Sequence, residues 1–215
     1  MVYTTDSETK SILLSDGSEV LLNKNSTLTL SNGFGDKLRD MDLEGEAYFK
    51  VKNNDNQPFI VNAGPLTVEV VGTEFNVNNS KSNKDISVFV NEGKVKVSNA
   101  STRTKVLLTA SESCNFNKLA KVLREDEESH INATSWFTKN LSFNNIPLGS
   151  AIEDIEEYFD IDVTVDNVSC LDSLYTSLFN DPNPDEVLTT ISSVFDFQII
   201  QKGEKSYELA GGKCE

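Results

Sequence analysis

The spacing of hydrophobic and polar residues changes once along the chain, close to residue 120. From residue 12 to about 117, apolar and polar residues alternate in short runs separated by turn residues, among them Asp16-Gly17 and Asn32-Gly33. Alternation with period two is typical of strands with one buried face, and Asp-Gly between two apolar runs predicts a type I′ hairpin. Many short strands at this spacing predict an antiparallel β-sandwich or barrel.

One glycine marks a change of face within this alternation. In "VEVVGTEFNV" (68–77), the periodic apolar residues are Val68 and Val70 before Gly72, and Phe75 and Val77 after it. An extra residue in a strand moves the following side chains to the other face, so this change of parity predicts a β-bulge at Gly72.

A pair of glutamates raises the question of catalysis. In "RDMDLEGEAYFKV" (39–51), Met41, Leu43, Ala47 and Phe49 share one face of a strand. Glu44 and Glu46 lie on the other face about 7 Å apart, a spacing that glycosidases use for two carboxylates. A catalytic acid must be desolvated to hold its proton near neutral pH, whereas these two belong to a polar row that includes Asp40 and Asp42. We therefore expect both glutamates to be solvated, unless a bulge at Gly45 turns one of them inward.

An internal repeat dominates the second half of the chain. "FNNIPLGSAIEDIEEYFDIDV" (143–163) aligns with "FNDPNPDEVLTTISSVFDFQI" (179–199) at a constant offset of 36 residues. Each copy carries an apolar stripe with helical spacing: Leu148, Ala151, Ile152, Ile155 and Phe159, then Val187, Leu188, Ile191, Val194 and Phe195. A proline stands at the expected start of each helix, and Asn183 with Glu186 resembles a capping box. Helices are therefore predicted at 147–159 and 184–195.

Short apolar strands flank both predicted helices. They are "LSF" and "IDVTV" in the first copy, "LYTSLF" and "FQIIQ" in the second, and "SYEL" at the end. This pattern predicts a small α+β domain with two βαβ-type repeats. The expected organisation is an all-β domain at 1–123, a polar linker at 124–135 and the α+β domain at 136–215, with Trp136 and Phe137 as core anchors.

The charge of the chain is uneven. Residues 1–134 carry 15 Lys and Arg against 19 Asp and Glu, while residues 135–215 carry 4 against 15, a net charge of −11. Phosphates would be repelled by the second part, so nucleic acid is not an expected partner. The longest apolar runs are too short to span a bilayer, and the first residues lack the features of an export signal.

The chain offers few groups for chemistry. Its one histidine, His130, falls in the predicted linker, where a histidine is far more often solvated than paired with a nucleophile such as Cys114. The acidic stretch 180–185 lacks calcium-loop spacing and is better explained as a helix cap. Cys170 and Cys214 could pair in an oxidising compartment or stay as thiols. We therefore predict no catalytic residue, cofactor or metal, and a function that depends on contact.

Five motifs follow one another along the chain: "LLSDGSEVLLNKNSTL", "LEGEAYFKV", "PFIV", "VEVVGTEFNV" and "VNEGKVKV". In this order they resemble the FecR-like anti-sigma regulators. The later "LSFNNIPLGSAIEDIEEYFDIDV" resembles the C-terminal domain of the Bacteroidetes-type members, which is similar to the signalling domain of secretins and TonB-dependent receptors. The resemblance extends over about residues 11–210.

The resemblance implies a function without catalysis. Proteins of this kind are single-pass inner-membrane regulators whose short cytoplasmic segment binds an extracytoplasmic-function sigma factor. Their periplasmic part receives a signal from the signalling domain of an outer-membrane TonB-dependent transducer. The cytoplasmic segment and membrane helix do not match any part of this sequence, so the chain is expected to be the periplasmic portion. The alternative hypothesis is a carbohydrate-binding β-sandwich module with an appended α+β domain, for which Tyr48 is the one clear aromatic residue on a polar strand face.

The contact surface is predicted from strand edges. The two repeats should leave an edge open in "LYTSLF" or "SYEL", and pairing with an incoming strand is a common mode of recognition. We therefore expect Tyr175, Ser177 and Tyr207 to contact the transducer, with the acidic side chains selecting a basic partner surface.

Overall fold

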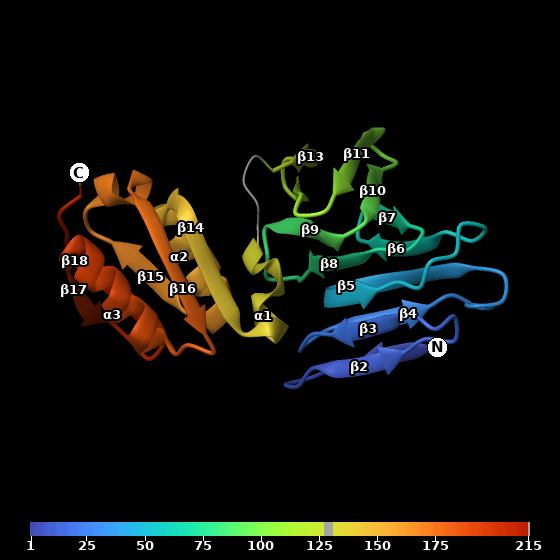
Figure 1. Ribbon diagram of the computed structural model, residues 1–215, viewed down its shortest axis with the longest axis horizontal. Helices are drawn as coiled ribbons and strands as arrows, with labels where there is room; N and C mark the ends of the chain where they lie inside the picture. The colour runs from blue at the N-terminus through green and yellow to red at the C-terminus, as the bar shows by residue number, and fades with distance from the viewer. Residues whose placement is uncertain (127–130, 215) are drawn as a thin grey trace. The chain divides into compact units, whose positions relative to one another are not determined.

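The computed structural model describes residues 1–126 and 131–214, which form two compact units, Met1–Ala133 and Thr134–Glu215 (Figure 1). Of the predicted linker at 124–135, Arg124 and Glu125 lie in strand β13 (Val122–Glu125), and Ile131–Thr134 form a short 3-10 helix, η1. β13 gave no visible pattern in the sequence because Leu123 is its one buried residue. No helix in the described part of the chain is long and apolar enough to cross a membrane.

The first unit is built from strands, as the alternating pattern predicts. Its strands in the described residues are β1 Val2–Thr4, β2 Lys10–Leu13, β3 Glu19–Leu22, β4 Thr27–Leu30, β5 Arg39–Lys50, β6 Phe59–Ala63, β7 Leu66–Val70, β8 Glu74–Asn79, β9 Asp85–Glu92, β10 Lys94–Asn99, β11 Thr104–Thr109, β12 Ser113–Asn117 and β13. Their order along the main path is β11-β10-β7-β6-β5-β8-β9-β12-β13, and the pairs are antiparallel except β5 with β6. The predicted antiparallel architecture is confirmed.

Strand β5 connects the two halves of this sheet. Its first part pairs with β4 and β6, and from Gly45 onward it pairs with β3 and β8. Met41, Leu43, Ala47 and Phe49 are buried along its whole length, as predicted from the sequence. Since the buried face does not change at the switch of partners, the apolar residues of both halves form one core.

The predictions of a type I′ turn at Asp16-Gly17 and of a β-bulge at Gly72 both need correction. The hairpin between β2 and β3 is present, but Gly17 has a φ of +84° while Asp16 is not among the residues with positive φ, so the turn is not type I′. The Asp16 carboxylate instead accepts hydrogen bonds from the backbone N–H and the hydroxyl of Ser18 at 3.0 and 2.8 Å. This side-chain turn holds the hairpin without a second left-handed residue.

The change of parity at Gly72 also has another cause. β7 pairs with β6 and β10, whereas β8 pairs with β5 and β9, so the chain crosses from one half of the sheet to the other at Gly72. A register irregularity does occur nearby, between Glu74 and Phe75. The alternating burial of β7 ends at this crossing, and in β8 the four residues from Phe75 to Asn78 are all buried, so the change of parity accompanies the change of strand partners.

The second unit has the predicted order of strands and helices. Its elements are α1 Ser135–Thr138, β14 Asn140–Pro147, α2 Leu148–Phe159, β15 Asp162–Val165, η2 Val168–Asp172, β16 Leu174–Asn180, α3 Pro184–Phe195, β17 Phe197–Gln201 and β18 Ser206–Gly211. The two strands of each repeat join different sheets, because β14 pairs with β16 and β15 joins the sheet β15-β18-β17. The predicted α+β class is confirmed.

The residues predicted to start α3 and the residues predicted to bury one face of each helix mostly have these roles in the structure. α3 begins with Pro184 in its first turn, and the Asn183 side chain accepts a hydrogen bond from the backbone N–H of Glu186 at 3.0 Å. The apolar stripes of α2 and α3 are buried, apart from the half-buried Phe159 and the exposed Val194. Trp136 and Phe137 are half-buried and their rings meet edge to face, with centroids 4.9 Å apart, so they are not the core anchors we expected. They lie on a helix of four residues, which can bury little of its surface.

Candidate partner-binding surface

Strand β16 has one open edge. Within the described residues it pairs with β14 alone, in a two-stranded antiparallel sheet (Figure 1). A strand with one neighbour leaves half of its backbone N–H and C=O groups without a strand partner, which is the feature that strand addition requires. The structure therefore places an edge in "LYTSLF", one of the two segments predicted.

The other predicted edge is wrong. β18, which contains "SYEL", is the central strand of its sheet, with β15 on one side and β17 on the other. Tyr207 pairs with Val163 in β15 and with Gln201 in β17, so its backbone is used on both sides. The argument from a sheet edge therefore does not apply to Tyr207.

The two remaining predicted contacts differ in their exposure. The Tyr175 side chain is 1% exposed and packs between the rings of Phe143 and Phe195, whose centroids lie 5.6 and 6.1 Å away. Burial raises the pKa of the Tyr175 hydroxyl above its usual value. Ser177 is half-buried on the same face of β16. Tyr175 can therefore offer a partner only its backbone.

The outer face of β16 carries two exposed leucines that sequence reasoning missed. Leu174 is 57% exposed and Leu178 is 74% exposed, while Tyr175 and Phe179 point into the core. The two leucines lie on the same face of an edge strand, so together they offer apolar surface beside the unpaired backbone groups. The signal was present in the sequence, because both faces of "LYTSLF" carry large apolar residues.

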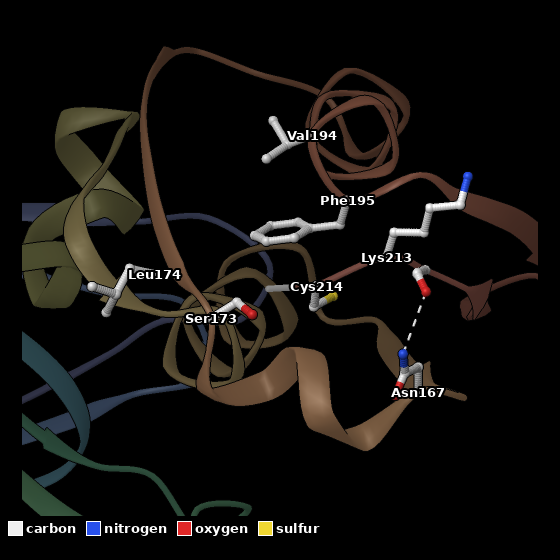
Figure 2. Close-up of a pocket in the computed structure, with 8 residues that line it drawn as sticks. Asn167, Ser173, Leu174, Val194, Phe195, Lys213 and Cys214 are labelled. Carbon is white, nitrogen blue, oxygen red and sulfur yellow. Dashed lines mark hydrogen bonds between the residues drawn. The ribbon is translucent and has the colours of Figure 1, made fainter.

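A hollow of about 640 Å³ lies at the start of this strand (Figure 2). Its lining comes from three segments: Asn167, Ser173 and Leu174; Val194 and Phe195 at the end of α3; and Gly212, Lys213 and Cys214 at the end of the chain. Figure 2 shows the ring of Phe195 projecting into this space. Leu174 lies on the outer face of β16 and also lines the hollow, so the hollow continues the surface of the open strand.

A disulfide bond borders the hollow. Cys170 in η2 and Cys214 after β18 are bonded, and their Cα atoms lie 5.2 Å apart, within the usual range for a disulfide. Of the two alternatives left open by the sequence, the structure has the paired form. Cys114, by contrast, is a buried thiol in the first unit, and burial raises its pKa to about 12. It is therefore protonated at neutral pH and is a poor nucleophile.

The charge around this surface is negative. All four lysines of the second unit lie within ion-pair distance of an acidic side chain: Lys139 with Asp181, Lys202 with Glu208, Lys205 with Asp160, and Lys213 with Asp196. The net charge of −11 over residues 135–215 is thus not offset by a separate basic patch. A partner with a basic surface would be attracted to this unit.

The glutamate pair of the first unit is not arranged for catalysis. Glu44 is exposed and forms an ion pair with the exposed Lys81 at 2.8 Å. Glu46 is half-buried, and its two carboxylate oxygens accept hydrogen bonds from the side-chain amides of Asn23 and Asn76 at 2.7 and 2.8 Å. Our expectation of two solvated carboxylates is therefore correct for Glu44 and wrong for Glu46.

Other candidate sites give no further constellation. In the described part of the chain, no group of three or more His, Cys, Asp or Glu residues could hold a metal ion. Tyr48 is half-buried and donates a hydrogen bond to Glu74 at 2.8 Å, so it does not offer a flat exposed ring to a sugar. His130 lies outside the described residues, and the stretch 180–185 leads into the cap of α3.

Comparison with known proteins agrees with this architecture. Residues 1–96 match the family model described as FecR protein, and residues 140–207 match the model described as FecR, C-terminal. The search of curated proteins returned no match.

Two solved structures are similar over nearly the whole chain. Both are crystal structures of a candidate anti-sigma factor from Parabacteroides distasonis ATCC 8503, at 1.65 and 2.50 Å resolution. The first has 25% sequence identity and a TM-score of 0.74, and the alignment covers 99% of this chain and 100% of that one. The second has 25% identity and a TM-score of 0.73, with 99% of each chain covered. The chain therefore belongs to the FecR family and has the structure of a FecR-like anti-sigma factor, a regulatory protein whose partner is a sigma factor.

Proposed function

We propose that this chain is the periplasmic signal-receiving region of a single-pass inner-membrane anti-sigma regulator. Its second unit binds the signalling domain of an outer-membrane TonB-dependent transducer. The signal reaches an extracytoplasmic-function sigma factor through the cytoplasmic segment that this family uses for sigma-factor binding. The chain itself works by protein contact, without catalysis and without nucleic acid.

The observation that carries this proposal is the open edge of β16. Strand addition needs unpaired backbone groups together with side chains that favour burial, and β16 offers both. Leu174 and Leu178 on the outer face would be covered by an incoming strand, and Ser177, on the inner face, would take part through its backbone. The negative charge of this unit favours a basic signalling domain and increases the rate of association at low salt.

A matched pair of leucines tests the assignment. Leu178 on β16 and Leu107 on β11 are 74% and 72% exposed, and both lie inside a strand. The Leu178→Thr variant should bind the purified signalling domain of the transducer about tenfold more weakly, since a leucine in the centre of an interface contributes roughly 1 to 2 kcal/mol. Leu107→Thr should bind like the wild type. Titration calorimetry of the full chain measures both, at low and high salt.

Proline substitutions test the backbone edge itself. Successive residues of an antiparallel strand direct their N–H groups alternately to the two sides. Of Thr176 and Ser177, one therefore donates toward β14 and the other toward the open edge. Proline at the edge-facing residue should weaken binding with little loss of stability, whereas proline at the other should destabilise the unit. If both proline variants bind normally while Leu107→Thr loses binding, the partner contacts the first unit and the proposal is wrong.

A further inference from the structure

The turn between β12 and β13 carries the most exposed large apolar side chain in the described part of the chain. Leu119 is 93% exposed, and Ala120 beside it is also exposed. A single exposed leucine is common on protein surfaces and by itself indicates no function. What Leu119 can bind depends on how firmly the turn is held and on which charges surround it.

The turn is held by Asn117, the last residue of β12. Its carbonyl accepts a hydrogen bond from the backbone N–H of Lys121 at 2.8 Å, and its side-chain oxygen accepts one from the N–H of Ala120 at 2.7 Å. The side-chain amide of Asn117 also donates to the carboxylate of Asp85 in β9 at 2.7 Å. These bonds keep Leu119 at the tip of the turn, so it does not have to leave a core to make a contact.

The loop between β8 and β9 lies beside this turn. The ammonium group of Lys118 donates to the carbonyl of Ser80 at 2.6 Å, and the backbone N–H of Lys118 donates to the carbonyl of Lys84 at 3.1 Å. Residues 80–84 and 118–121 therefore lie side by side, and together they form the paired loops of the first unit.

The paired loops are basic, although the whole chain has a net charge of −15. They contain Lys81, Lys84, Lys118 and Lys121 and no Asp or Glu. Within the described residues, Lys81 is the one lysine of the four that forms an ion pair, with the exposed Glu44 at 2.8 Å. Charges more than about 10 Å away are largely screened at physiological salt. The paired loops therefore attract an anionic surface locally, in spite of the acidic remainder of the chain.

An exposed leucine on a firmly held turn, surrounded by lysines, fits the surface of an anionic bilayer. An apolar side chain can enter the boundary between headgroups and acyl chains. The stems of lysines lie along apolar surface and leave their ammonium groups among the phosphates. An acidic protein fits less well, because a protein interface commonly uses about 20 to 30 residues a side. The paired loops have nine residues.

We propose that the paired loops bind the surface of an anionic phospholipid membrane, with Leu119 at the headgroup boundary and the four lysines at the phosphates. A few cations and one leucine give weak and reversible binding. In a chain anchored in the same membrane, as in the proposed function, weak contacts are sufficient because anchoring raises the effective concentration of the surface. The contact holds the first unit against the bilayer and uses no residue of β16.

The test measures co-sedimentation of the full chain with lipid vesicles. Vesicles of equal parts phosphatidylcholine and phosphatidylglycerol should bind the chain at about 0.1 M salt, and vesicles of phosphatidylcholine alone should not. Leu119→Ser should weaken binding about fivefold, because it removes the apolar side chain that enters the bilayer. Leu13→Ser is the matched control and should bind like the wild type, because Leu13 is 74% exposed but lies next to a hairpin turn that carries Asp16 and Glu19.

Two pairs of lysine substitutions distinguish the local cluster from the overall charge. Lys84→Gln combined with Lys121→Gln should weaken binding about tenfold, since both charges lie at the phosphates. Lys24→Gln combined with Lys105→Gln changes the net charge by the same amount at exposed residues outside the paired loops. This second pair should bind like the wild type.

A spin-labelled lipid in the vesicles locates the contact on the chain. The amide NMR signals of Leu119 and Ala120 should lose intensity in its presence, whereas the signal of Leu13 should not. Absence of binding by the wild type, normal binding by Leu119→Ser, or equal losses in the two lysine pairs overturns the proposal. Because these measurements do not include the transducer, such a result leaves the proposed function standing.

Discussion

Arg39 and Asp16 form an ion pair that is almost completely buried. Nη1 of Arg39 lies 3.3 Å from Oδ2 of Asp16, and the two side chains are 1% and 8% exposed. The same guanidinium donates to the backbone carbonyls of Lys52, Gln57 and Val71. One side chain thus joins the hairpin turn at Asp16 to the loops at both ends of the 52–71 segment.

Removal of this arginine should strongly destabilise the first unit. Arg39→Met leaves the Asp16 carboxylate buried without its cation and several carbonyls without a donor, which should cost about 3 to 5 kcal/mol of unfolding free energy. The exposed Arg103 is the control, and Arg103→Met should change stability by less than about 0.5 kcal/mol. Urea denaturation measures both. Equal stabilities for the two variants would contradict a structural role for the buried pair.

Two glycines have similar backbone angles but different surroundings, so substitutions at them distinguish the cost of backbone strain from the cost of steric crowding. Gly45 and Gly33 have φ values of +93° and +83°. A Cβ atom at Gly45 would lie 2.3 Å from the Ser26 hydroxyl oxygen, whereas nothing lies within 4 Å of one at Gly33. Gly33→Ala should cost about 1 kcal/mol from the backbone angle, and Gly45→Ala clearly more, since Ser26 must move. Thermal unfolding compares the two, and a smaller effect at Gly45 would refute the crowding argument.

Glu46 should matter for stability and Glu44 should not. Glu46→Ala removes the hydrogen bonds that its carboxylate accepts from Asn23 and Asn76, and a hydrogen bond to a charged group contributes about 1.5 to 3 kcal/mol. Glu44→Ala breaks one exposed ion pair and should change stability by less than about 1 kcal/mol. Chemical denaturation distinguishes the variants. Loss of signalling in Glu44→Ala at normal stability would show that this carboxylate has a functional role after all.

Glu74 should make the folding stability of the first unit depend on pH in the acidic range. Lys50 at 2.7 Å and the Tyr48 hydroxyl at 2.8 Å both bind its carboxylate, and these contacts lower the pKa of Glu74 below 4.5. Because the pKa in the folded state is the lower one, the stabilisation is complete above about pH 4.5 and is lost as the pH falls through the folded-state pKa.

Lys50→Met should raise the pKa of Glu74 toward 4.5, since the largest cause of the shift is removed. NMR titration of the carboxyl carbon follows this group directly. Lys81→Met serves as the control, because Lys81 pairs with Glu44 and should leave Glu74 unchanged. An unchanged titration of Glu74 in Lys50→Met would contradict the assignment.

Much of the fold is encoded locally, and this part could be predicted. The alternation in β5 placed Phe49 in the core, and the 36-residue repeat with Asn183 before Pro184 located α3. These features depend on neighbouring residues, because strand period, helix period and capping act over a few positions. The fold class of each unit, all-β or α+β, follows from these local features.

The position of each strand in its sheet was decided only by the tertiary structure. "LYTSLF" and "SYEL" look alike in sequence, yet among the residues that the structure describes β16 has one strand partner and β18 has two. Hydrogen bonds between strands are formed by the backbone, which is the same for every residue, so a single strand does not encode its neighbours. The same holds for Glu46, whose partners Asn23 and Asn76 come from other strands or their ends. The contact surface of this protein depends on such long-range pairings, whereas its element types depend on local pattern.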